Sequence, residues 1–179
     1  MLTRIITGVI GIAAAVAIIT KGGWVFALAV LLLSAVGWHE YHNMAASKGL
    51  NVYYLTSGLG AFLLTAIPAG GYYVEMEELY IMAFLTMFTA LFFIFNTLEG
   101  LYRHCNCGDN NWAGNTAASI WGMIYCGLLF GHVILLRAFD YGPHIDLGFR
   151  VFEYGEICLW IVLLGTWASD TFAYFFGRA

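Results

Sequence analysis

An aspartate, Asp170, lies inside the last strongly apolar run of this chain, which begins near Ile157. A carboxylate at mid-depth in hydrocarbon costs on the order of 3 kcal/mol, so such residues usually face a protein interior or a water-filled cavity and often mark a functional site. Ionised carboxylates bind divalent cations. The position therefore predicts a cation or amine site at Asp170, or else a structural role in which the carboxylate pairs with a basic group or hydrogen-bonds to a neighbouring helix.

Several other polar or aromatic side chains share the helical face of Asp170. Residues three, four and seven positions apart lie on one side of an α-helix. This relation joins Asp170 to Thr166, Trp167 and Tyr174, and it joins Tyr174 to Arg178. Because a guanidinium binds phosphate through paired hydrogen bonds, we expect this face to line a cavity that opens to the cytoplasm, where Arg178 meets phosphate and Asp170 holds a cation.

The composition places these residues in a membrane protein. Of the 179 residues, 61% are hydrophobic and 10% are charged, whereas soluble domains carry about 25% charged residues. With only 7 Lys and Arg and a net charge of -4, the chain lacks the concentrated basic surface that nucleic-acid binding requires. Nucleic acid is therefore excluded as a partner, while single basic groups can still bind phosphate ligands.

The apolar runs predict about six transmembrane helices. They follow Arg4, extend from Trp24 to Trp38, and cover residues 55–73, 79–95, 116–136 and 157–176. A helix needs about 20 apolar residues to cross the hydrocarbon. Because backbone groups must be satisfied within the bilayer, and no alternating strand pattern is visible, we expect an all-α fold that forms one transmembrane helical region over residues 1–179.

The polar joints and the basic residues predict a topology. Basic residues on the side of the two termini are Arg4, Lys48, Arg103 and Arg178, and those on the other side are Lys21, Arg137 and Arg150. Cytoplasmic segments carry the excess of Lys and Arg. We therefore expect the termini and the joints at residues 39–51 and 98–115 in the cytoplasm, and the joint "VEMEE" outside.

Histidines and cysteines outside the last helix each admit two interpretations. His39 and His42 flank Glu40, and His104 precedes Cys105 and Cys107. Metal sites combine such ligands, but a structural zinc site normally needs two ligand pairs, and polar residues after a span are common. The ordinary interpretation is favoured for both groups. For His132, which lies within a predicted span, a buried hydrogen bond to another helix is favoured over a proton relay.

The segment "WASDTFAYFFGR", from Trp167 to Arg178, resembles the cytoplasmic-side helix of bacterial phosphatidate cytidylyltransferases. The segments "MLTRIITGVIGI", "GGWVFALAVLLLSAVGWHEYHNMAASKG" and "SIWGMIYCGLLFGHVILLR" resemble that family in order and spacing. The resemblance covers most of the chain. It implies a multi-pass enzyme of the bacterial inner membrane, active in phospholipid synthesis, that uses Mg²⁺ and forms CDP-diacylglycerol and pyrophosphate from CTP and phosphatidic acid.

Site residues follow from the same resemblance. It implies a catalytic role for Asp170, which is also a possible metal ligand, and substrate contacts for Trp167, Thr171, Tyr174 and Arg178. A homodimer is a further possibility. Charge that develops on phosphate oxygens in such a reaction must be neutralised by metal and basic groups, so positioning and electrostatics would do most of the catalysis.

The chain also departs from the family pattern. Members of the family continue past this helix into a loop rich in Lys, Ser and Pro and then into a segment with further aspartates. We therefore expect residues 1–179 to be an N-terminal portion that lacks the catalytic C-terminal part and does not catalyse alone. The alternative is a non-enzymatic membrane transporter or assembly subunit that uses Asp170 as an ion site.

Overall fold

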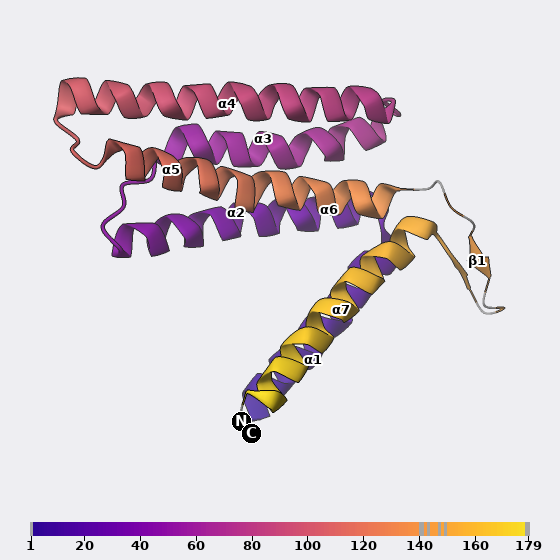
Figure 1. Cartoon of the computed structure of the whole chain (residues 1–179). Coiled ribbons are helices and arrows are strands. Elements are labelled where there is room, and N and C mark those ends of the chain that lie inside the picture. The colour runs from indigo at the N-terminus through magenta and orange to yellow at the C-terminus, as the bar shows by residue number, and fades with distance from the viewer. Residues whose placement is uncertain (1, 140–141, 143, 147, 149, 178–179) are drawn as a thin grey trace. The chain divides into compact units, whose positions relative to one another are not determined.

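The computed structural model describes residues 2–139, 142, 144–146, 148 and 150–177. Within these residues the protein is almost entirely helical, as Figure 1 shows, which confirms the predicted all-α class. Contacts divide the chain into two compact units. The central unit is Gly23–Ile134, and the terminal unit combines Met1–Gly22 with Leu135–Ala179.

The central unit is a bundle of antiparallel helices (Figure 1). Its helices are α2 (Gly23–Ser47), α3 (Tyr54–Tyr73), α4 (Glu78–Cys107) and a continuous rod made of α5 (Trp112–Met123), the π-helix η1 (Ile124–Leu128) and the start of α6 (Leu129–Ala138). Helix α3 contacts all of the others. Small and polar side chains on α3, such as Ala61 and Thr65, are completely buried and allow this close packing.

The π-helix explains why two hydroxyl side chains lie buried among apolar helices. A π-turn breaks the regular i to i−4 bonding of a helix and often frees carbonyl groups. The hydroxyl of Ser34 donates to the carbonyl oxygen of Cys126 at 2.5 Å, and that of Thr65 lies 3.1 Å from the carbonyl oxygen of Gly127. These contacts from α2 and α3 satisfy backbone acceptors that lipid could not satisfy.

Helices α2 and α4 extend further than their apolar runs. The joint expected at residues 39–51 is helical to Ser47, and the joint expected at residues 98–115 is helical to Cys107 and again from Trp112. Each extension ends at a glycine with positive φ, Gly49 at 78° and Gly108 at 67°. Hydropathy marks the part of a helix that lies in lipid, whereas left-handed glycines mark where the helix itself ends.

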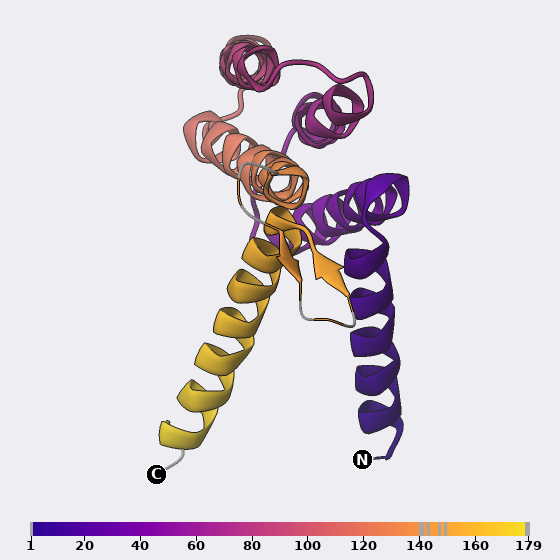
Figure 2. The same ribbon diagram turned by 90° about the vertical axis from the view of Figure 1, so that its right-hand side faces the viewer.

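The terminal unit contains α1 (Leu2–Lys21), the end of α6, two short strands and α7 (Tyr154–Phe176). Strands β1 (Ile145–Asp146) and β2 (Val151–Phe152) pair antiparallel just before α7, as Figure 2 shows. These strands are not predicted from the sequence, because pairs of residues are too short to show an alternating pattern.

Four helical segments in the described part of the chain are long and apolar enough to cross a membrane: Gly23–Ser47, Glu78–Cys107, Trp112–Ala138 and Tyr154–Phe176. The expected number of about six is therefore confirmed only in part. Helix α3 is not among the four because its buried face carries Ser57, Gly60 and Thr65, which lower its hydropathy. A helix surrounded by other helices does not need a lipid-compatible surface on every side.

Candidate functional site

Helix α7, which carries the predicted site, is buried only near its beginning. Gly155, Glu156 and Leu159 are buried, and the Glu156 side chain is 1% exposed. Its carboxylate accepts a hydrogen bond from the Arg150 guanidinium at 2.9 Å and a longer one from the Trp160 indole at 3.4 Å. A buried carboxylate is tolerated when it is paired and hydrogen-bonded in this way.

Two arginines connect the start of α7 to the end of α1. Arg150 also donates to the carbonyl oxygen of Thr20 at 3.0 Å. Arg137 donates to the carbonyl oxygen of Ile19 at 3.1 Å and to the Glu153 carboxylate at 2.5 Å. Helix C-terminal carbonyls lack partners within the helix and carry partial negative charge, so arginine satisfies both needs. We call Arg137, Arg150, Glu153 and Glu156 the arginine junction.

Gly22 makes room for the arginine junction. It follows α1 with a φ of 58°, and a Cβ atom built there would lie 2.5 Å from Nη2 of Arg137. In the sequence, Arg137 and Arg150 indicated only the predicted topology. Two Arg and two Glu around the start of an apolar helix could have indicated ion pairs there. Their sequence positions do not show that both arginines contact α1.

The described part of the predicted Asp170 face lies on the surface of the terminal unit. Every residue from Leu164 to Gly177 is exposed, including Asp170 and Thr171. The Thr171 hydroxyl donates to the Trp167 carbonyl oxygen at 2.7 Å, and the Tyr174 ring meets that of Phe175 edge-on at 5.8 Å. The helical spacing of Trp167, Asp170 and Tyr174 is thus confirmed, whereas their roles stay predictions.

Arg178, the predicted phosphate ligand, lies outside the described residues. Asp170 is the acid on the described part of this face, and no three His, Cys, Asp or Glu side chains gather as a metal site in the part of the chain that the structure covers. Mg²⁺ is commonly held by one or two carboxylates together with substrate phosphates. The residues present therefore fit a metal that arrives with a nucleotide, and they do not form a complete protein cage.

Three of the histidines lie next to polar or aromatic groups in the central unit. His39 lies 3.1 Å from the side-chain amide of Asn43, and the His42 ring meets the Tyr54 ring edge-on at 4.8 Å. His104 lies 3.0 Å from the carbonyl oxygen of Asp109, and the neighbouring Cys105 is free and exposed. The His39 and His104 rings thus contact a nearby amide or carbonyl group, whereas the Nδ1 atom of the His42 ring is buried without a hydrogen-bond partner among the described residues.

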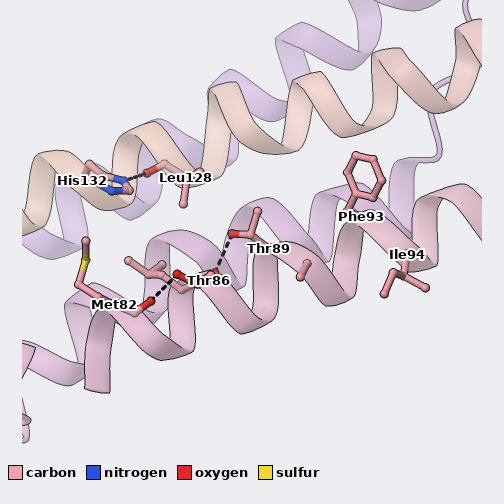
Figure 3. A pocket seen from close by; sticks show the side chains of 9 residues that line it. Met82, Thr86, Thr89, Phe93, Ile94, Leu128 and His132 are labelled. Carbon is pink, nitrogen blue, oxygen red and sulfur yellow. Dashed lines mark hydrogen bonds between the residues drawn. The ribbon is translucent and has the colours of Figure 1, made fainter. Parts of the chain in front are cut away.

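His132 lies in a different setting from the one expected. Its side chain is exposed, and its Nδ1 atom lies 2.8 Å from the carbonyl oxygen of Leu128 in the same helical rod. The prediction of a buried hydrogen bond to another helix is therefore wrong. The imidazole instead borders a groove of about 540 Å³ between α4 and the η1–α6 part of the rod, within the central unit (Figure 3).

Comparisons with known proteins point to one family. A phosphatidate cytidylyltransferase of Synechocystis sp. is 45% identical to this chain over 47 residues, which are 26% of this chain and 16% of that protein. The match thus spans less than a fifth of the relative's length. No solved structure matches the chain. The family profile described as "Cytidylyltransferase family" matches residues 2–179, nearly the whole sequence. The chain therefore belongs to the cytidylyltransferase family.

Proposed function

We propose that the protein acts in phospholipid synthesis as a nucleotidyltransferase that moves CMP from CTP to phosphatidic acid. The observation that carries this proposal is the family match over residues 2–179, which includes all of α7 and its polar face. The name of the Synechocystis relative, phosphatidate cytidylyltransferase, supports this choice of substrates. The family match does not favour the alternative of a transporter or assembly subunit.

The proposed reaction is a phosphoryl substitution at the membrane. A phosphate oxygen of phosphatidic acid forms a bond to the α-phosphorus of CTP, while the bond from that phosphorus to the bridging oxygen of the β-phosphate breaks. The electron pair leaves with pyrophosphate, and CDP-diacylglycerol remains in the bilayer. Negative charge increases on oxygens during the step, so fixed positive charge and correct positioning lower the barrier.

The proposed roles place the chemistry on α7. Asp170 is the catalytic residue, and its carboxylate would hold Mg²⁺ together with the phosphates of CTP. When bound, Mg²⁺ would neutralise charge on the phosphate oxygens. Arg178 binds phosphate, and Trp167, Thr171 and Tyr174 contact substrate. Trp167, Asp170, Thr171 and Tyr174 are exposed, which leaves them accessible to a nucleotide.

We also propose that the chain crosses the bacterial inner membrane six times with both ends in the cytoplasm. Helices α1 and α3 each have 20 residues, a length of about 30 Å at 1.5 Å per residue, which matches the hydrocarbon thickness. The hydrogen bond of 2.9 Å from the Asn51 amide to the Asn115 side chain brings two joints expected in the cytoplasm together at one end of the central unit. A homodimer stays a prediction that cross-linking in membranes can test.

The test uses the full reading frame that encodes this chain, expressed in membranes and supplied with radiolabelled CTP, phosphatidic acid and Mg²⁺. We expect labelled CDP-diacylglycerol, and we expect Asp170→Asn to lower its rate of formation at least about a hundredfold, the loss typical of a group that stabilises developing charge. Glu78→Gln is the matched control, because it makes the same change at an exposed acid in the first turn of α4. Equal rates for Asp170→Asn and Glu78→Gln would remove Asp170 from the mechanism, and absence of product from the unaltered protein would overturn the proposed function.

A further inference from the structure

The groove beside His132 has two different walls (Figure 3). One wall is α4, which contributes Met82, Thr86, Thr89, Phe93 and Ile94 together with Leu85 and Ala90, and the other is Leu128 of η1 with His132 of α6. Its volume of about 540 Å³ lies within the range of small-molecule sites. All of these residues belong to the central unit, so the groove does not depend on α7 or on the proposed reaction.

The polar atoms of the groove are hydrogen-bond acceptors. A carbonyl oxygen only accepts, so the contact of 2.8 Å between Nδ1 of His132 and Leu128 requires Nδ1 to carry the proton. In the neutral imidazole this leaves Nε2 with a free lone pair. The hydroxyl protons of Thr86 and Thr89 go to the carbonyl oxygens of Met82, at 2.8 Å, and Leu85, at 2.7 Å. The lining therefore offers acceptors and neither Lys nor Arg.

The imidazole of His132 lies near one end of the helices that form the groove. Met82 comes four residues after the start of α4, and His132 comes six residues before the end of α6, so they lie about 6 and 9 Å from the helix ends at 1.5 Å per residue. Phe93 comes 15 residues after the start of α4, about 22 Å along its axis. The groove thus extends along α4 from about 6 Å to about 22 Å from the start of this helix, with His132 near one end and its apolar lining further along.

We propose that this groove binds a neutral membrane lipid with a free hydroxyl group, of the diacylglycerol type. The hydroxyl donates to Nε2 of His132, and an acyl chain lies along Ala90, Phe93 and Ile94. An exposed imidazole facing plain lipid tails would lack a hydrogen-bond donor, which is costly in hydrocarbon. An anionic phosphate would bring further acceptors to a surface that already consists of acceptors and has no cation. A neutral alcohol with an acyl chain supplies a hydrogen-bond donor to His132 and an apolar chain to the rest of the groove.

The experiment compares two photoactivatable lipids. The protein is placed in phosphatidylcholine nanodiscs that contain either a diacylglycerol with a diazirine in one acyl chain or the same molecule with its hydroxyl methylated. Labelled peptides are then identified by mass spectrometry. We expect the free alcohol to label the α4 and α6 segments of the groove about three- to tenfold more than the methyl ether does, the ratio that one hydrogen bond in a membrane provides.

Variants test the part played by His132. His132→Phe keeps a ring but removes the acceptor and should make the two probes label equally, whereas His132→Gln keeps an acceptor and should preserve part of the difference. Thr97→Val is a control for the loss of a polar side chain outside the groove, and it should leave the difference between the two probes unchanged. Thr97 bonds to the carbonyl oxygen of Phe93 at 2.8 Å but does not line the groove. Circular dichroism and thermal melting confirm that each variant is folded.

Three results would overturn the proposal. Equal labelling of the groove of the unaltered protein by both probes would show that the hydroxyl is not recognised, and labelling confined to other helices would show that the groove is not the site. Disulfide cross-links between two copies through cysteines placed at Met82 and Ile94 would show that a second chain occupies the groove. The comparison of the two probes on the unaltered protein needs no variant, so a misfolded variant would not prevent a decision.

Discussion

Substitution of Arg150 should reveal how strongly the arginine junction holds α7. Arg150→Gln leaves the carboxylate of Glu156, which is 1% exposed, without its charged partner, and leaves the Thr20 carbonyl oxygen without a donor. Breaking a buried ion pair from one side costs about 3–5 kcal/mol. Because the Arg150 side chain is 36% exposed, water weakens its interaction, and we expect a loss of about 2 kcal/mol in the free energy of unfolding.

Substitution of the partner residue, Glu156, should lower the free energy of unfolding by less than substitution of Arg150 does. This difference between the two variants is the more specific prediction. Glu156→Gln leaves a partly exposed guanidinium that water can solvate, so we expect a loss of about 1 kcal/mol or less. The double variant buries no charge and should be more stable than Arg150→Gln alone. The two changes should therefore couple by more than the cost of Glu156→Gln, about 1–2 kcal/mol, in a double-mutant cycle. A conservative reference is Arg103→Gln, which breaks a pair with side chains 37% and 24% exposed and should cost about 0.5 kcal/mol.

The assay is an SDS titration in mixed micelles with thiol labelling of Cys158 as the reporter. Cys158 is a free, partly buried cysteine two residues after Glu156, so its reactivity follows the start of α7. The remaining free cysteines, Cys105, Cys107 and Cys126, are replaced by serine or alanine in every variant. A smaller loss for Arg150→Gln than for Glu156→Gln, or a coupling energy near zero, would refute the view that a buried, paired carboxylate holds the helix.

Three further expectations concern the packing of the bundle and its orientation. Gly127→Ala would put a Cβ atom 2.5 Å from the Cα atom of Ala61 and should lower the free energy of unfolding by about 1–3 kcal/mol or more. Gly165→Ala, with nothing within 4 Å of the new Cβ atom, should leave the melting temperature unchanged or raise it. Equal melting temperatures for the two variants would contradict the tight contact at Gly127. Ser34→Ala removes the donor to Cys126 and should cost about 1 kcal/mol in the same melts, so an unchanged melting temperature would mean that this carbonyl needs no partner. A cysteine at position 48 should react with an impermeant reagent only from the cytoplasmic side, and labelling from outside alone would reverse the topology.

Apolar runs were sufficient to place the helices but not to delimit them. The run at residues 55–73 corresponds closely to α3, and the run at 157–176 to α7. Helix α2 continues to Ser47, where the Leu50 amide donates to Ala45 and the Gly49 amide to Ala46. This pair of bonds is a glycine-based helix end, which could have been read from "SKG". The joint was placed too early because hydropathy alone was used.

The contacts that shape the candidate sites could not be predicted in the same way. The hydrogen bond from Arg137 to Ile19 joins residues 118 positions apart, and the one from Ser34 to Cys126 joins residues 92 positions apart. Helical periodicity gives the face of a residue but not the helix that this face meets. The prediction for His132 failed for this reason, since a polar residue within a span can bond to its own helix and leave its other nitrogen for a ligand.

The structure separates the groups that hold α7 from the groups that we expect to react. Asp170 comes 14 residues after Glu156, about 21 Å along a helix axis and therefore most of the way across a hydrocarbon layer about 30 Å thick. The paired charges of the arginine junction satisfy each other and the end of α1, so they leave no free charge to compete with Asp170 for a cation. The exposed second half of α7 contributes little burial to the terminal unit, and loss of the Asp170 charge can therefore change catalysis with little effect on folding.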